Sequence, residues 1–359
     1  MRTLRLSTLP LLLLGILGIF TAEQVRAAED CEVSGGMQYI CGLVNPEDLV
    51  NIPGTDWVIA SSDEEGLGFY LIDARTRTVQ AFYTPDNAPQ NHNRQLYPNC
   101  PGAPDLSNFN THGLNIRKRS PGHYILYSVA HGAREGVEIF EIDATRTRPS
   151  ITWTGCVEMP PGTRANSVAS FSDGSLLTTV LVLPGESYTT FLRDRRPTGA
   201  VYQWSPGDER FSLLPGAELP GNNGIEISRD ETEFYVASSG FNTIVAFERA
   251  NPTRQLRTSR TLDFSPDNVR LSPNGYLLTS GMLSDEPSCG SFPETREIIV
   301  ACARGYQVSA INPRDMDDET LFEAPANPIF SNATIGIMVN SMIWVGTFDG
   351  DRIAIRVLP

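Results

Sequence analysis

The sequence has 359 residues, 42 acidic against 28 basic side chains, and a formal net charge of −14. This acidity argues against nucleic acid and anionic membrane surfaces as partners, because both repel a strongly negative protein. The length allows one large domain or two ordinary ones.

The first 27 residues have the pattern of a secretory signal peptide. Arg2 and Arg5 precede an apolar run over residues 9–22, and Val25 and Ala27 supply small residues before the expected cleavage point. An uncleaved anchor is the alternative, but the run is shorter than the roughly 20 residues of a membrane span. We expect residues 1–27 to be removed and the mature chain to be secreted or periplasmic, with no membrane span in it.

Short strands dominate the rest of the chain, and helical periodicity is almost absent. Alternating runs occur at residues 57–60, 124–127, 137–142, 234–237, 276–279 and 342–345. Turn tetrads such as residues 171–174 and 272–275 lie between them, rich in Gly, Asn and Asp, which tolerate the backbone angles of tight hairpins.

These strands form a unit that recurs six times. The copies begin at Glu47, His112, Asn166, Asn223, Asp267 and near Ala333. Repetition of short strands at a similar spacing predicts an all-β fold, a six-bladed β-propeller in which residues 28–359 form a single domain. A β-sandwich is the alternative, and six near-equivalent copies fit it poorly.

The residues that open the repeats predict a central metal site. The first strand of each propeller blade lines the central channel, so the opening residue of each blade should point at the axis. Oxygen ligands are offered there by Glu47, Asn166, Asn223, Asp267 and Asn268. Such all-oxygen sets suit Ca²⁺. Each residue alone could be an ordinary turn residue, because Asn223-Gly224 is a common hairpin dipeptide.

Six short segments carry a resemblance to a known family. They are Pro46-Glu47-Asp48-Leu49, Thr111-His112-Gly113-Leu114, Val129-Ala130-His131, Ala165-Asn166-Ser167-Val168, Asn222-Asn223-Gly224-Ile225 and Pro266-Asp267-Asn268-Val269. Because these segments occur in the family's order, the chain resembles the calcium-dependent lactonases of the paraoxonase/arylesterase group. That group belongs to the wider gluconolactonase and strictosidine-synthase-like propellers.

The resemblance implies one catalytic Ca²⁺ held by the five oxygen ligands, and a catalytic pair formed by His112 and His131. A second, structural Ca²⁺ of that family uses the acid after the Glu and the acid after the first Asn. Asp48 is present here, but Ser167 replaces the other acid, which puts the second ion in doubt. The family's disulfide between the terminal strands has no counterpart, because the chain ends without a cysteine.

The activity implied is hydrolysis of a small-molecule lactone or activated aryl ester. We expect His112 to act as the general base and His131 to orient it or relay the proton, since a neutral imidazole can accept a proton near pH 7. In another version of the mechanism, His112 only positions the substrate.

Three alternative functions are a gluconolactonase-type sugar-lactone hydrolase without histidine-pair chemistry, a non-catalytic ligand-binding propeller and a strictosidine-synthase-like condensing enzyme. The sequence leaves the oligomeric state open.

Two further expectations concern the cysteines and a long loop. Six cysteines in an exported chain indicate disulfides and allow fifteen pairings, of which Cys289 with Cys302 is the one we expect. The stretch from Thr84 to Phe109 is rich in Pro and Asn. Because loops this long are often functional, we predict a flap over the channel mouth, held partly by Cys100.

Overall fold

The computed structural model describes residues 33–284, 289 and 302–358. The predicted signal peptide, residues 1–27, lies outside the described residues. No helix among the described residues is long and apolar enough to cross a membrane.

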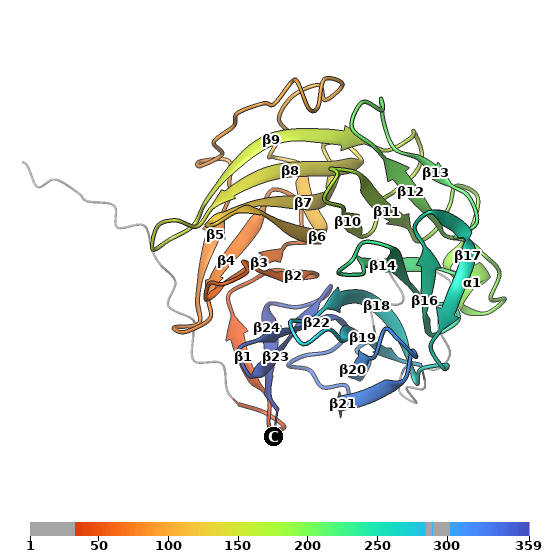
Figure 1. Ribbon diagram of the computed structural model, residues 1–359. Coiled ribbons are helices and arrows are strands. Elements are labelled where there is room, and N and C mark those ends of the chain that lie inside the picture. The colour runs from red at the N-terminus through yellow and green to blue at the C-terminus, as the bar shows by residue number, and fades with distance from the viewer. Residues whose placement is uncertain (1–32, 285–288, 290–301, 359) are drawn as a thin grey trace, which may run out of the picture.

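Six four-stranded antiparallel sheets are arranged as blades around a central axis (Figure 1). The first contains β2 (Leu49–Asn51), β3 (Trp57–Ser61), β4 (Phe69–Asp73) and β5 (Thr78–Phe82). The second contains β6 (Phe109–Ser120), β7 (His123–Gly132), β8 (Gly136–Asp143) and β9 (Ser150–Glu158). The third contains β10 (Val168–Ser170), β11 (Leu176–Val180), β12 (Ala200–Trp204) and β13 (Ser212–Leu214).

The remaining blades follow in chain order. The fourth contains β14 (Asn222–Ile227), β15 (Glu233–Ser238), β16 (Thr243–Glu248) and β17 (Asn251–Thr258). The fifth contains β18 (Phe264–Leu271), β19 (Leu277–Leu283), β20 (Tyr306–Ile311) and β21 (Asp318–Ala324). The sixth contains β22 (Ala333–Val339), β23 (Met342–Thr347), β24 (Arg352–Val357) and β1 (Gln38–Cys41). The predicted six-bladed all-β propeller is therefore confirmed.

The sixth blade joins the two ends of the described chain. Its outer strand β1 pairs antiparallel with β24, from Gln38 opposite Ile355 to Cys41 opposite Arg352. We did not predict this pairing from the sequence. Backbone hydrogen bonds between these two strands thus close the ring of blades.

Apolar side chains between neighbouring blades form the core. Between the first two blades, the ring of Phe69 meets those of Phe109 and Phe140 edge to face, at centroid separations of 6.0 and 5.2 Å. All three rings are fully buried. Such aromatic pairs add to the free energy gained by burying their area, and they hold the first two blades together.

The inner strands carry β-bulges at equivalent positions. The pairing register shifts between Thr111 and Leu114 in β6, between Asn222 and Ile225 in β14, between Pro266 and Val269 in β18, and between Ala333 and Gly336 in β22. A bulge inserts an extra residue and redirects its side chain. The bulges in β6, β14 and β18 contain residues that were predicted to point at the axis.

The predicted flap over residues 84–109 is wrong. Its backbone lies along the outer strand of the second blade, where Asn91 N donates to Trp153 O and Asn93 N to Thr154 O, both at 2.8 Å. Figure 1 shows this segment outside β9, away from the axis. The loop is indeed held by Cys100, which forms a disulfide with Cys156.

The cysteines of the described part of the chain are all oxidised. The expected Cys289–Cys302 disulfide is present, and Cys41 is disulfide-bonded as well. Disulfides persist in oxidising compartments, so these bonds are compatible with the predicted export.

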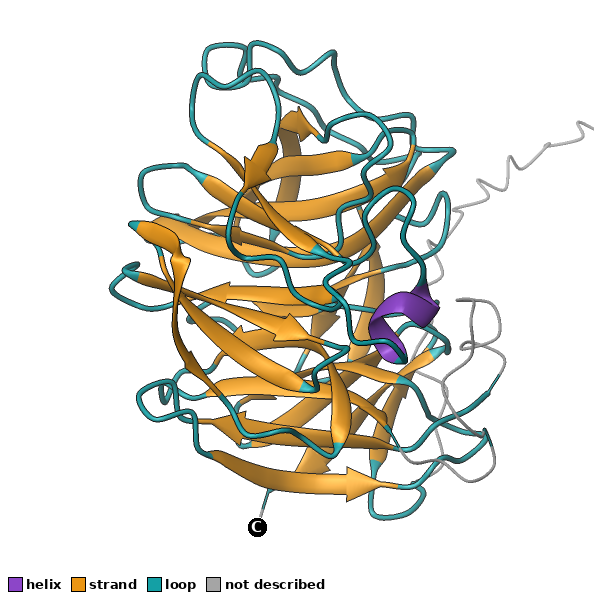
Figure 2. Cartoon of the chain, turned by 90° about the vertical axis from the view of Figure 1, so that its right-hand side faces the viewer, coloured by secondary structure: helices purple, strands orange, loops and turns teal. Residues whose placement is uncertain are grey.

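The long connection between β11 and β12 contains a helix that the sequence did not predict. Helix α1 (Tyr188–Leu192) has five residues, and Ser187 caps it by accepting a hydrogen bond from Thr190 N at 3.3 Å. The side view in Figure 2 shows this helix among the loops at one face of the disc. The opposite ends of the inner strands border a second cavity, which is lined by residues such as Asn51, Glu226 and Arg270.

Candidate active site in the axial channel

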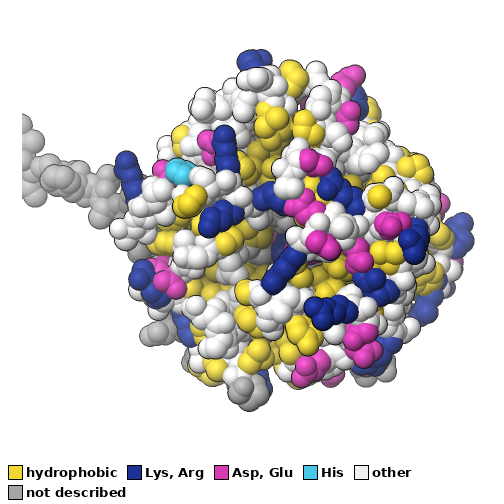
Figure 3. Space-filling view, in the orientation of Figure 1, with side chains coloured by type: hydrophobic (Ala, Val, Ile, Leu, Met, Phe, Trp, Pro, Cys, Tyr) yellow, Lys and Arg dark blue, Asp and Glu magenta, His cyan; other side chains and the backbone are white. Residues whose placement is uncertain are grey.

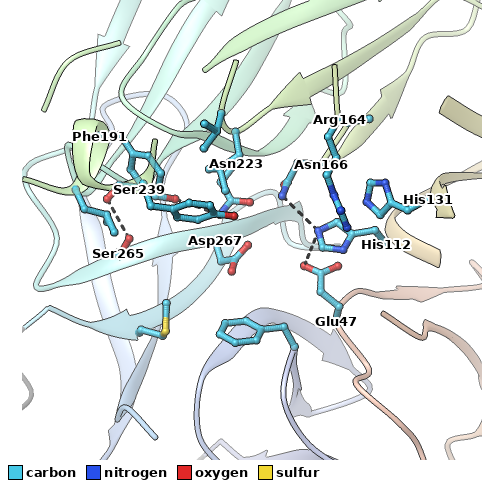
Figure 4. A pocket seen from close by; sticks show the side chains of 17 residues that line it. Glu47, His112, His131, Arg164, Asn166, Phe191, Asn223, Ser239, Ser265 and Asp267 are labelled. Carbon is cyan, nitrogen blue, oxygen red and sulfur yellow. Dashed lines mark hydrogen bonds and ion pairs between the residues drawn. The ribbon is translucent and has the colours of Figure 1, made fainter. Parts of the chain in front are cut away.

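A cavity of about 240 Å³ opens at the end of the channel where the inner strands begin. Its polar lining consists of Glu47, His112, His131, Arg164, Asn166, Asn223, Ser239, Ser265 and Asp267. Its apolar lining consists of Ala165, Leu181, Val182, Tyr188, Phe191, Leu192, Met282 and Phe348. A small polar cluster therefore faces a largely hydrophobic wall (Figure 4).

The structure brings together all five residues that were predicted as oxygen ligands. Glu47, Asn166, Asn223 and Asp267 line the cavity, and Asn268 contacts Glu47 through its side chain. They come from the first, third, fourth and fifth blades. The sixth blade helps to position Glu47, because Thr334 Oγ1 donates to the Glu47 backbone oxygen at 2.5 Å.

Four buried oxygens in this cluster have no hydrogen-bond donor among the described residues: Glu47 Oε2, Asn166 Oδ1, Asn223 Oδ1 and Asn268 Oδ1. An unpaired buried oxygen is costly, and native structures rarely leave one without a partner. Four such acceptors in one cluster fit a group that accepts lone pairs, namely a hard cation.

The amide nitrogens of the same residues do have partners. Asn166 Nδ2 donates to His112 Nε2 at 3.3 Å, Asn268 Nδ2 to Glu47 Oε1 at 2.6 Å and Asn223 Nδ2 to Ser239 Oγ at 3.1 Å. Ser239 Oγ in turn donates to the backbone oxygen of Pro266 at 2.8 Å. Each amide is thus held in an orientation that leaves its oxygen free.

Glycines let the ligand-bearing segments of adjacent blades approach closely. A Cβ on Gly113 would come within 2.5 Å of Asn166 O, and one on Gly224 within 2.6 Å of Asn268 Cα. No side chain fits at either position. The His-Gly and Asn-Gly dipeptides of the repeats are therefore required for packing around the axis, besides any role in turns.

Burial strongly perturbs Glu47, which is 1% exposed. Desolvation raises its pKa to about 8, His112 opposes this shift, and the nearby carboxylates Asp48, Asp267 and Asp63 reinforce it. Without a cation this carboxyl group tends to hold a proton at neutral pH. A positive charge at the free Oε2 would favour the ionised form.

The two predicted catalytic histidines lie side by side. Their ring centroids are 5.3 Å apart, at an interplanar angle of 58°. His112 Nε2 faces the cluster, 3.9 Å from Glu47 Oε1, while its Nδ1 is 3.7 Å from Asp63 Oδ1. Because Asn166 Nδ2 donates to His112 Nε2, this ring nitrogen must be the acceptor. In the neutral ring the proton is therefore on Nδ1, which faces Asp63.

His131 is buried behind His112. Its Nδ1 is 2.7 Å from Glu135 Oε2, and its Nε2 has no partner among the described residues. Desolvation lowers the pKa of His131 to about 4; the Glu135 hydrogen bond opposes the shift, and the charges of His112 and Arg164 add to it. The ring is therefore neutral at pH 7.

Asp48 has a protein counter-charge. Its Oδ2 accepts hydrogen bonds from Leu114 N at 2.7 Å and from the Arg270 guanidinium, which also donates to Leu114 O. Burial raises the pKa of Asp48 and Arg270 opposes this shift. The side chain that we considered for a second Ca²⁺ is thus already paired with a cation.

The donors of the central cluster decide which cation would fit there. No group of three or more His, Cys, Asp and Glu side chains in the described ranges forms a metal-binding cluster. The predicted set contains two carboxylates and three amides. Carboxylate and amide oxygens without sulfur are the donors that Ca²⁺ prefers, so the residues present fit that ion.

Sequence reasoning missed several residues of this site. Asp63 and Glu135 contact the histidines, Arg270 neutralises Asp48, and α1 supplies Tyr188, Phe191 and Leu192 to the wall. Of these, only Glu135 had a signal in the sequence, since it follows His131 by four residues in a turn that returns the chain to the same edge.

The fold and the cavity define a class: six-bladed propellers with an axial pocket lined by acids, amides and two histidines. Residues 120–347 match the model of the SMP-30/gluconolactonase/LRE-like region, which is more than half of the chain. The chain therefore belongs to this family, and the predicted gluconolactonase-like superfamily is confirmed. No curated protein sequence matches the chain.

Solved structures share the fold at low sequence identity. A gluconolactonase from Xanthomonas campestris is 16% identical, with 94% of each chain covered and a TM-score of 0.52. A calcium-binding regucalcin from Agrobacterium tumefaciens is 12% identical, with 88% of this chain and 91% of that chain covered and a TM-score of 0.52. A luciferin-regenerating enzyme is 12% identical, with 88% and 92% covered and the same TM-score.

Proposed function

We propose that this protein is an exported, calcium-dependent hydrolase of lactones or activated aryl esters. The observation that carries the proposal is the cluster of four unpaired buried oxygens beside a histidine pair, in a pocket with a hydrophobic wall. The gluconolactonase and the calcium-binding regucalcin of the same fold support lactone chemistry and a divalent cation.

The cation would be held by Glu47, Asn166, Asn223, Asp267 and Asn268. When bound, Ca²⁺ supplies a positive charge that polarises a carbonyl oxygen and stabilises the negative charge that develops on it during attack. The amide orientations set by Ser239, His112 and Glu47 keep the ligand oxygens in place without rearrangement.

His112 is the proposed general base. Its Nε2 faces the oxygen cluster and carries the lone pair, so it can take a proton from a water molecule that attacks the substrate carbonyl. Asp63, near Nδ1, would stabilise the imidazolium that forms. His131, neutral at pH 7 and packed against His112, supports the ring and can pass the proton on.

The hydrophobic wall favours an apolar acyl or aryl group over a polyhydroxylated ring. Leu181, Val182, Phe191 and Met282 offer no hydrogen bonds from their side chains to sugar hydroxyls. Burial of apolar surface stabilises a complex by about 25 cal/mol per Å². We therefore place alkyl-substituted lactones and aryl esters ahead of sugar lactones.

The test is hydrolysis of γ-lactones, δ-lactones, a sugar lactone and aryl esters by the purified mature protein, with and without chelator. We expect turnover that chelator abolishes and Ca²⁺ restores, and that Asn223→Ala and His112→Gln each lower by about 100-fold or more. Asn251→Ala and His123→Gln change exposed residues far from the cavity and serve as matched controls. Turnover that persists in chelator and in both variants would rule out the proposed mechanism.

A further inference from the structure

Arg164 lines the cavity but has no part in the proposed mechanism. It lies in the loop between β9 and β10, two residues before Asn166, and it lines the pocket. Figure 4 shows its side chain extending beside His112 and His131. Among the described residues that line the cavity, it is the only lysine or arginine.

The guanidinium of Arg164 has no ion pair and no hydrogen bond within the described part of the chain. Nearby carboxylates contact other groups: Glu135 pairs with His131, and Asp63 lies next to His112. Other arginines close to the channel are paired, Arg134 with Glu138 and Arg270 with Asp48. Arg164 is thus available to a group that enters the pocket.

The charges of the pocket leave a place for an anion. Glu47 and Asp267 together balance a divalent cation, and Arg164 adds a permanent positive charge to the described lining beyond that cation. An arginine can hold a carboxylate through two parallel hydrogen bonds, and these are stronger than bonds between neutral groups. The charge of Arg164 also contributes to lowering the pKa of His131, which places it within electrostatic reach of the reaction centre.

We propose that Arg164 is a specificity-determining residue that selects lactones or esters carrying a second, anionic group. This inference rests on the proposed function and narrows its substrate class. The scissile carbonyl lies over the oxygen cluster, the apolar part packs against Phe191 and its neighbours, and a carboxylate on the substrate pairs with the guanidinium.

The kinetic test compares two substrates that share one ring: 5-oxotetrahydrofuran-2-carboxylate and its neutral carboxamide. We expect the wild-type protein to hydrolyse the carboxylate with the lower KM. Arg164→Gln should raise KM for the carboxylate about 10-fold or more while leaving KM for the carboxamide within about 2-fold. Arg164→Lys should keep part of the preference. Arg314→Gln removes an exposed charge elsewhere and controls for net charge.

The binding test needs no turnover. Calorimetry with tetrahydrofuran-2-carboxylate and tetrahydrofuran-2-carboxamide, neither of which can be hydrolysed at the ring, should show tighter binding of the anion in the wild type and equal binding in Arg164→Gln. Equal affinity for both compounds in the wild type, or loss of both in the variant, would overturn the inference. Turnover of the neutral lactone without charge preference would sustain the proposed function and refute the role of Arg164. Anion preference in calorimetry without turnover of any substrate would support the role of Arg164 in binding and refute the proposed hydrolase function.

Discussion

Asn268 Nδ2 donates a hydrogen bond to Glu47 Oε1 at 2.6 Å, although the two residues are 221 positions apart in the sequence. They belong to the fifth and the first blade, with the sixth blade between them. The bond leaves Asn268 Oδ1 and Glu47 Oε2 without protein partners in the described structure, and both atoms are buried. A contact between distant blades thus creates two of the free oxygens on which the site depends.

Removing this contact should abolish cation binding. We expect the wild type to bind one Ca²⁺ per chain and to gain about 2.7 kcal/mol of stability at a Ca²⁺ concentration 100 times its Kd. Asn268→Leu removes both a ligand oxygen and the donor to Glu47, so its thermal midpoint should not respond to Ca²⁺. Calorimetry and thermal unfolding measure both quantities, with Asn251→Leu as the control. A second equivalent of tightly bound Ca²⁺ would contradict the pairing of Asp48 with Arg270.

Arg270→Gln should strongly destabilise the protein. The substitution leaves Asp48 buried without its counter-charge, and breaking a buried pair in this way typically costs about 3–5 kcal/mol. Denaturant unfolding measures the loss. Arg254→Gln, which breaks an exposed pair with Glu248, should cost less than about 1 kcal/mol. A similar cost for both variants would show that Arg270 does not neutralise Asp48.

The depressed pKa of His131 predicts a pH dependence of stability. Its pKa is about 4 in the folded protein, below the ordinary value of 6.5, so the unfolded chain binds the proton more readily between these values. His131 therefore lowers the free energy of unfolding as the pH falls from about 6.5 to 4, by about 3 kcal/mol in all. This contribution is absent above pH 7.

The measurement is the free energy of unfolding against pH for the wild type and His131→Gln. The variant should lose less stability than the wild type over that interval, whatever its stability at pH 7. His123→Gln, which alters an exposed histidine, should follow the wild-type curve. Parallel curves for wild type and His131→Gln would mean that His131 titrates normally in the folded protein.

Replacing Cys100 and Cys156 together by serine should lower the free energy of unfolding and leave kcat and KM unchanged. The disulfide closes a loop with a sequence separation of 56, and its removal is expected to cost about 2–4 kcal/mol. No described residue from 84 to 108 lines the cavity, so kcat and KM of the folded variant should stay near wild-type values. A changed KM would restore the idea that this loop acts at the channel mouth.

The fold and the axial residues could be predicted from the sequence because both follow a repeated pattern. Glu47, Asn166, Asn223 and Asp267 occupy equivalent places in four copies of one unit, so a single geometric rule located them all. Asp63 and Arg270 have no such equivalents; they reach the site through tertiary contacts that no local pattern encodes. The five-residue helix α1 is too short to show a hydrophobic period, and its place on the pocket wall depends on close packing of Phe191 against Gly221 and Gly240.

Charges of both signs are interspersed on the face of the disc shown in Figure 3, without one dominant patch. On this face the pattern leaves no extended positive area for a polyanion, in keeping with the net charge of −14. It agrees with the expectation that the partner is a small molecule.

The pairing of β1 with β24 determines which part of the fold can form last. Gln38 emerges from the ribosome early, yet its partner Ile355 is among the last residues to be made. Strand β1 therefore has no partner strand until synthesis is nearly complete. The ring of blades can close only after that point. Asn268 and Glu47 belong to the fifth and first blades, which lie on either side of this sixth blade. We therefore expect the axial oxygens to come together only once the sixth blade is complete.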